Sequence, residues 1–166
     1  MSQPESSAVM RAVKAIWFSI LILLFAAWWG GLTFYAIIVV PIGTEQVGSI
    51  EQGFITQQVT RWHNVLLTAM TTCLAIDALH RKNRCLWVLI ACLFLVDVLL
   101  LIEHSRLTGM MDFGRRTVPE GFYGRHAIYL WLTAVEWGLG VALAALAVFS
   151  CQSSGQRKSP KAPPTS

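Results

Sequence analysis

The sequence predicts an all-α integral membrane protein, a bundle of four transmembrane helices. Of its 166 residues, 55% are hydrophobic and only 13% are charged, against about 25% charged in an average soluble domain. The mean hydropathy is +0.55, and the apolar residues fall almost entirely into four long runs. This composition excludes a disordered protein and a disulfide-stapled scaffold, and it argues against a soluble enzyme.

The four apolar runs set the predicted spans. A transmembrane helix needs about 20 mostly apolar residues to cross a hydrocarbon core of ~30 Å. The runs that meet this length cover approximately 15–40, 62–79, 85–102 and 127–151. The first run holds no charged residue and is longer than the apolar part of a cleaved signal peptide, so it is interpreted as a retained helix. We expect it to end at Pro41 and Gly43, which are residues typical of helix ends.

The connections between the spans contain two helix-start signals. Residues 49–52 and 117–120 both fit the capping-box pattern, which predicts helices that start near Ser49 and near Pro119, before the apolar runs begin. Residues 80–84 form too short a connection for more than a tight turn. The second and third helices are therefore expected to form an antiparallel hairpin.

The basic residues predict the orientation. Most lysine and arginine residues, including every lysine, flank the spans on the side of the two termini. Because cytoplasmic flanks carry the excess of positive charge, both termini are expected in the cytoplasm, with a bacterial inner membrane as the location. These charges would meet anionic lipid headgroups, so the lipid bilayer is the expected partner and nucleic acid is not. Residues 1–12 are expected to be a short disordered tail, 13–151 the membrane domain, and 152–166 a disordered basic tail.

Three histidines share the outer membrane boundary in this topology: His63, His104 and His126. Imidazole is a ligand for copper, iron and haem, and helical bundles build such sites from facing helices. The first hypothesis is therefore a metal or haem site at the outer mouth, built from two or three of these histidines, with haem or copper as the cofactor. The alternative is that they are amphipathic residues that reach toward the headgroups.

Three acidic residues interrupt the spans: Asp77, Asp97 and Glu136. By helix rise, Asp97 is about 10 Å deeper than His104, and Glu136 about 15 Å deeper than His126. An ionised carboxylate there costs at least ~2.5–3.5 kcal/mol. Asp97 and Glu136 should therefore face the bundle interior and be protonated, hydrogen-bonded or bound to a cation. They are either candidate proton carriers or structural acids that bind a neighbouring helix.

Small and aromatic residues occur together in the first and fourth spans. Gly30, Gly31, Gly138 and Gly140 remove side chains at places where helices can approach closely. Trp28 and Trp29 directly precede the first glycine pair. We interpret this arrangement as packing in preference to a ligand cleft.

Several short motifs resemble those of a known family. They are the segment from Trp28 to Tyr35 (WWGGLTFY) followed by Val39-Val40-Pro41, the segment Arg61-Trp62-His63-Asn64, and the segment Phe122-Tyr123-Gly124-Arg125-His126. They resemble small four-span bacterial proteins of uncharacterised function, which are similar to the membrane core of copper resistance D proteins. The resemblance implies copper handling, with His63 and His126 as ligands.

The chain has no phosphate loop, nucleophile elbow or zinc-protease motif, so an enzyme is not favoured. Three functions remain open: a metal- or haem-binding bundle, a non-catalytic scaffold or accessory subunit of a larger membrane complex, and a small proton-coupled transporter. The last would need a second copy to form a pore, so a homo-oligomer is also open.

Overall fold

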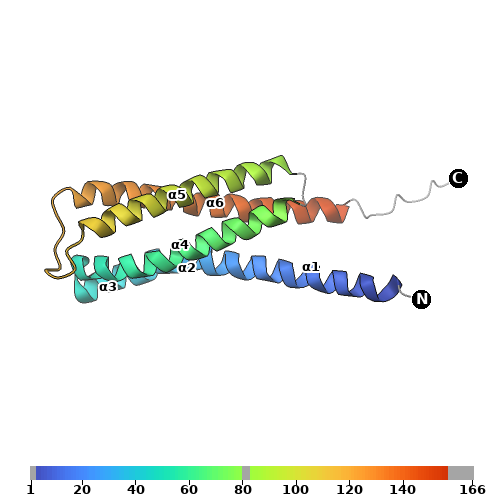
Figure 1. Cartoon of the computed structure of the whole chain (residues 1–166), viewed down its shortest axis with the longest axis horizontal. Helices are drawn as coiled ribbons and strands as arrows, with labels where there is room; N and C mark the ends of the chain where they lie inside the picture. Colours follow the sequence, from blue (N-terminus) through green and yellow to red (C-terminus); the bar gives the residue numbers. More distant parts are fainter. Residues whose placement is uncertain (1–2, 80–82, 157–166) are drawn as a thin grey trace.

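The computed structural model describes residues 3–79 and 83–156 of the chain, which form four long helical rods side by side (Figure 1). The elements in order are α1 (Gln3–Phe25), η1 (Ala26–Gly30), α2 (Gly31–Phe34), η2 (Tyr35–Val39), α3 (Val40–Val47), α4 (Ser49–Leu79), α5 (Arg84–Met110) and α6 (Phe122–Gln156). In this part of the chain the only β-type pairing is an isolated bridge between Asp112 and Thr117. The predicted all-α bundle is confirmed.

The first rod is one continuous helix from α1 to α3, which two π-helical segments, η1 and η2, widen locally. The prediction that it ends at Pro41 and Gly43 is wrong, because it continues to Val47. Pro41 lacks an N–H group and its ring crowds the preceding turn. The five residues of η2 directly precede α3, whose first turn holds this proline. A π turn absorbs the misfit, and the helix continues.

Gly48 ends the first rod and lets the chain reverse into α4. Its φ of 87° lies in the region that favours glycine, and its N–H donates to the carbonyl oxygen of Thr44 at 3.0 Å. The predicted helix start at Ser49 is confirmed. A Cβ atom on Gly43 would overlap the side chain of Gln52, so this glycine allows α3 and α4 to pack closely.

The connection between α5 and α6 folds back over the start of α4. Arg116 forms an ion pair with Glu51, and the rings of Phe113 and Phe54 meet edge to face at 5.3 Å. α6 begins at Phe122 and not near Pro119, whose carbonyl oxygen instead accepts the N–H of Phe122 at 3.0 Å in a preceding turn. This loop is therefore attached to the start of α4.

Other predicted boundaries also differ from the structure. The helix α1 begins at Gln3, so the expected disordered tail is wrong for residues 3–12. α6 continues to Gln156, and residues 157–166 of the predicted basic tail lie outside the described residues. The expected turn at 80–84 also lies mostly outside them. Asn83 caps α5 by accepting the N–H of Leu86 at 3.3 Å.

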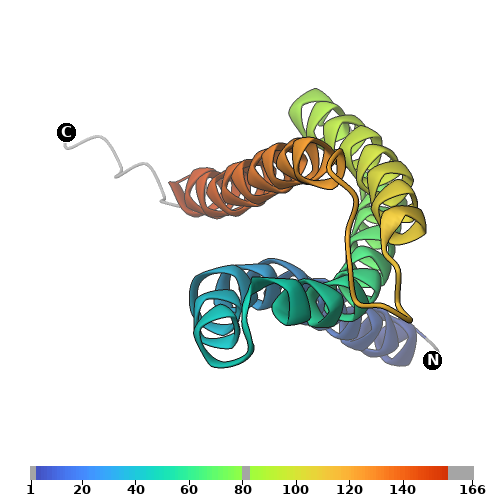
Figure 2. The same ribbon diagram turned by 90° about the vertical axis from the view of Figure 1, so that its left-hand side faces the viewer.

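The rods form an open arc when viewed along their axes, with the first rod and α6 at its two ends (Figure 2). α5 packs against α4 and α6, and α4 packs along the first rod. The core consists of apolar residues from all four rods, among them Trp28, Leu67, Leu93 and Leu143. Side chains of the first rod and α6 therefore have to meet across the arc, and the candidate site lies where they do so.

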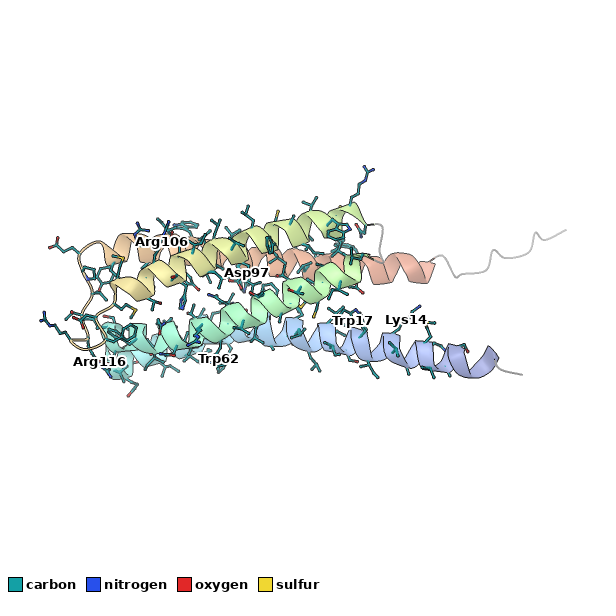
Figure 3. The ribbon with its side chains drawn as sticks, in the orientation of Figure 1. Lys14, Trp17, Trp62, Asp97, Arg106 and Arg116 are labelled. Carbon is teal, nitrogen blue, oxygen red and sulfur yellow. The ribbon has the colours of Figure 1, made fainter. Side chains whose placement is uncertain are left out.

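Three of the rods are long and apolar enough to cross a membrane: Ser7–Val47, Arg84–Met110 and Phe122–Phe149. α4 has a comparable length but carries more polar residues, among them Gln57, Gln58 and Arg61. Figure 3 shows Asp97 midway along the bundle, Arg106 and Arg116 toward the end with the loops, and Lys14 toward the opposite end. The charged groups thus lie mainly at the ends of the rods, as expected for a membrane protein.

Candidate functional site

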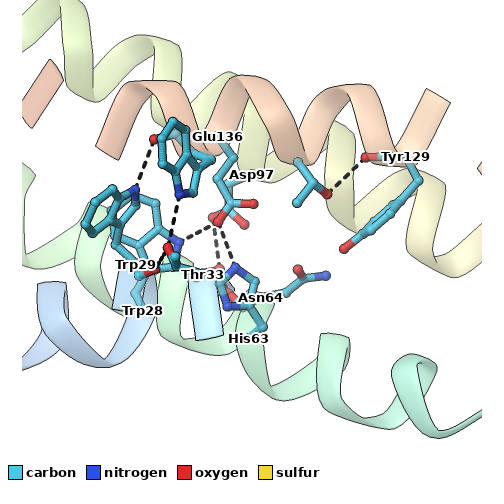
Figure 4. Close-up of polar contacts among 11 residues, drawn as sticks. Trp28, Trp29, Thr33, His63, Asn64, Asp97, Tyr129 and Glu136 are labelled. Atoms are coloured by element: carbon cyan, nitrogen blue, oxygen red, sulfur yellow. Dashed lines mark hydrogen bonds and ion pairs between the residues drawn. The ribbon is translucent and has the colours of Figure 1, made fainter. Parts of the chain in front are cut away.

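Glu136 of α6 is the centre of a buried polar cluster halfway along the bundle (Figure 4). Its side chain is 0% exposed. Its Oε1 accepts the indole N–H of Trp28 at 2.5 Å and lies 2.8 Å from Nε2 of His63 on α4. One carboxylate oxygen thus joins the first rod, α4 and α6.

Asp97 belongs to the same cluster and comes from α5, the one rod that does not contact Glu136 in the bonds above. It is 2% exposed, and its Oδ2 accepts the hydroxyl of Thr68 at 2.9 Å. Asp97 is close enough to both Glu136 and His63 for their charges to act on it. Two buried carboxylic acids and one imidazole therefore lie within one electrostatic neighbourhood.

The cluster also holds polar atoms without partners among the described residues. Buried polar atoms are normally hydrogen-bonded, so unpaired ones need an explanation. Those in and beside the cluster are Oε2 of Glu136, Oδ1 of Asp97, both side-chain polar atoms of Asn64 and Oγ1 of Thr71. Their positions on α4, α5 and α6 give the centre of the bundle a set of unused donors and acceptors.

Arginine does not neutralise this cluster. In the described part of the chain, the arginine ion pairs are made with Glu51, Glu103 and Asp112. The ion-pair partner of Glu136 is His63, which is charged only when protonated. The charge state of the cluster therefore depends on bound protons.

The π-helical segment η1 brings the tryptophans of the first rod to α6. Trp28 is 0% exposed and donates to Glu136, while the next residue, Trp29, donates to the carbonyl oxygen of Trp137 at 3.0 Å and stacks on its ring. A π turn spreads successive side chains differently from an α turn, and such turns are frequent at functional sites. The tryptophan pair therefore connects the two ends of the arc.

Gly140 is the glycine that makes room for this connection. A Cβ atom there would overlap the indole ring of Trp29, whereas one at Gly30, Gly31 or Gly138 would have no neighbouring atom within 4 Å. Of the four glycines expected at close contacts, Gly140 alone meets the expectation among the described residues.

This geometry predicts unequal effects of two alanine substitutions. Gly140→Ala should displace the rigid Trp29 ring and lower the free energy of unfolding by about 1–3 kcal/mol, as overpacking usually does. Gly138→Ala is the matched control on the same helix and should leave stability within about 0.5 kcal/mol. Unfolding in mixed detergent micelles, followed by tryptophan fluorescence, measures both. Equal losses for the two variants would contradict the close packing of Trp29 on Gly140.

The three predicted histidines do not all lie in one site. His63 is bound to Glu136, whereas His104 and His126 line a separate cavity near the loop end, where His126 stacks on Phe122. No three His, Cys, Asp or Glu side chains in the described ranges lie close enough to hold one metal ion. His104 and His126 therefore share one cavity, whereas His63 belongs to the cluster around Glu136.

The predicted positions of two intramembrane acids agree with the structure. Asp97 and Glu136 face the interior and accept hydrogen bonds, as expected. Asp77 accepts the indole N–H of Trp17 at 3.3 Å and lines a cavity of about 570 Å³ between the four rods, on the side of the cluster toward the termini. The sequence missed the contact between His63 and Glu136 and the part played by Trp28.

The position of His63 explains the missed contact. From the apolar runs, His63 was expected at the membrane boundary and Glu136 deep below it. Each in fact lies 14 residues after the first residue of its helix, or about 21 Å along the axis. Counting from the capping-box signal at Ser49 would have placed His63 well inside the bundle.

Comparison of the chain with protein-family models, with curated proteins and with solved structures finds no match.

Proposed function

We propose that this chain is an integral membrane protein that binds and transfers protons at the His63–Glu136 pair, as a small proton-coupled transporter. The observation that carries the proposal is the 2.8 Å contact between His63 Nε2 and Glu136 Oε1, which is buried among four rods and lies next to a second buried acid, Asp97. Intramembrane acids and histidines that face a bundle interior are typical of proton relays.

The chemistry of the pair supports proton exchange. Trp28 can only donate its N–H, so Glu136 Oε1 must accept from it. A proton on His63 Nε2 is donated to the same oxygen, and a proton on Glu136 can pass to an unprotonated Nε2 across one hydrogen bond. Thr68, Asn64 and the unpaired oxygen of Asp97 extend the polar surface from α4 to α5.

The proposal places all four rods across the cell membrane with both termini on the cytoplasmic side. α4 would cross together with the three more apolar rods, because its polar residues Asn64 and Thr71 are buried in the bundle and Thr68 donates its hydroxyl to Asp97 of α5. The excess of lysine and arginine near the termini supports the orientation. A reporter that is active only in the cytoplasm, fused to either terminus, tests it.

Infrared difference spectroscopy tests proton binding directly. A pH titration of the detergent-solubilised protein should show the carboxyl C=O band of a protonated buried acid, and Glu136→Gln should remove the part contributed by Glu136. Glu120→Gln, in the exposed loop, is the matched control and should leave the band of the buried acid unchanged. If Glu136→Gln leaves every pH-dependent carboxyl band in place, Glu136 exchanges no proton and the proposal is wrong.

A further inference from the structure

A second cavity, of about 300 Å³, lies near the loop end of the bundle, between the end of the first rod, α4, α5 and α6. This volume is at the lower end of the range for sites that bind small molecules. The polar groups of its wall are hydroxyls, amides and imidazoles, and they include Gln57, Thr60, His104, Thr108, His126 and Tyr129. The cavity therefore combines hydrogen-bonding groups with the aliphatic and aromatic side chains between them.

The wall carries no carboxylate, ammonium or guanidinium group among the described residues. Of the arginines near its lining residues in the sequence, Arg106, Arg116 and Arg125 are paired with Glu103 or Glu51. Arg61, which follows Thr60, lines a different cavity. A charged ligand in this cavity would lose its hydration without gaining a counter-charge, which is costly. The cavity therefore favours an uncharged ligand.

Aromatic side chains define the shape of the ligand. Phe122 and His126 both line the cavity, and their rings stack with centroids 5.7 Å apart and planes 13° from parallel. Tyr123 and Tyr129 add two more rings to the same wall. Aromatic rings pair favourably with other aromatic rings beyond the area they bury, so this wall suits a planar ring.

Gln57 defines the polar group of the ligand. Its Nε2 donates to the hydroxyl of Thr108 at 3.2 Å, while its Oε1 is buried without a partner. Gln57 lines the cavity, and an unpaired buried acceptor is satisfied by a group that brings a donor. A hydroxyl group on the ring would supply that donor.

We propose that this cavity binds an uncharged aromatic compound that carries a hydroxyl group, that is, a ligand of the phenol class. The hydroxyl donates to Gln57 Oε1, and the ring lies against the aromatic wall formed by Phe122 and His126. The inference goes beyond proton transfer, uses none of the residues of the His63–Glu136 pair, and is tested without reference to proton exchange.

Calorimetric titration of the purified full chain with three related probes tests the proposal. Naphthol should bind saturably. Methoxynaphthalene keeps the ring but lacks the donor, and it should bind about tenfold more weakly, as expected for the loss of one hydrogen bond. Naphthalene sulfonate carries a charge and should show no saturable binding. Titrations into protein-free micelles give the contribution of the detergent.

Neighbouring glutamines of α4 provide the matched variants. Gln57→Leu should weaken naphthol binding about tenfold and leave methoxynaphthalene unaffected, whereas Gln58→Leu, at an exposed position, should match the wild type. Circular dichroism shows that each variant is folded. The proposal is overturned if naphthol shows no saturable binding, or if methoxynaphthalene or naphthalene sulfonate binds as tightly as naphthol. It is also overturned if folded Gln57→Leu binds naphthol with the affinity of the wild type.

Discussion

Glu136→Gln is expected to abolish proton movement through the reconstituted protein. Glutamine keeps the size of the side chain and can still accept the N–H of Trp28, but it cannot carry a proton to or from His63. In proteoliposomes under a membrane potential, the proton flux reported by an internal pH dye should fall about a hundredfold or more, because positioned proton-transfer groups typically contribute at least that much.

Two controls separate this loss from damage to the bundle. Glu120→Gln lies in the exposed loop and should retain the flux of the wild type. Glu136→Gln should keep its helical content, which circular dichroism measures. A proton flux through Glu136→Gln equal to that of the wild type would contradict proton transfer at this residue. A wild-type proton flux no higher than that of protein-free vesicles would contradict it as well.

Trp28→Phe is expected to cause the largest loss of stability among conservative substitutions in the described part of the chain. It removes the N–H donor to a buried carboxyl group, and hydrogen bonds to charged groups contribute about 1.5–3 kcal/mol. It also leaves a void where the larger ring was fully buried. The free energy of unfolding in mixed micelles should fall by about 2–4 kcal/mol.

Trp131→Phe is the matched control for this loss. Trp131 lies on α6 with 75% of its surface exposed, so the same change of side chain there should alter the unfolding free energy by less than about 0.5 kcal/mol. If the two substitutions have equal effects, Trp28 does not hold the first rod to α6 in the way described.

The helical architecture could be predicted from sequence because it depends on local signals. Long apolar runs and a capping box at Ser49 specify helices without reference to the rest of the chain. Burial of Asp97 and Glu136 could also be predicted, because the cost of placing a carboxylate in lipid leaves the bundle interior as the favourable position.

The composition of the cluster could not be predicted in the same way. The pairing of His63 with Glu136 depends on how far α4 and α6 extend beyond their apolar runs, and the sequence gives only weak signals for those ends. The position of Trp28 depends on a π turn, which has no simple sequence pattern. His63 was grouped with the other two histidines because its depth was measured from hydropathy alone.

The distance along the chain between Trp28 and Glu136 has a consequence for biosynthesis. These partners are 108 residues apart, and membrane helices that are made first are inserted first. Trp28 and His63 are therefore synthesised before their partner, and they stay without it until α6 is made. Glu136 then joins a site where both of these side chains are already present. A chain that stops before α6 would leave Trp28 and His63 without the carboxylate that accepts from them, so formation of the cluster depends on the insertion of α6.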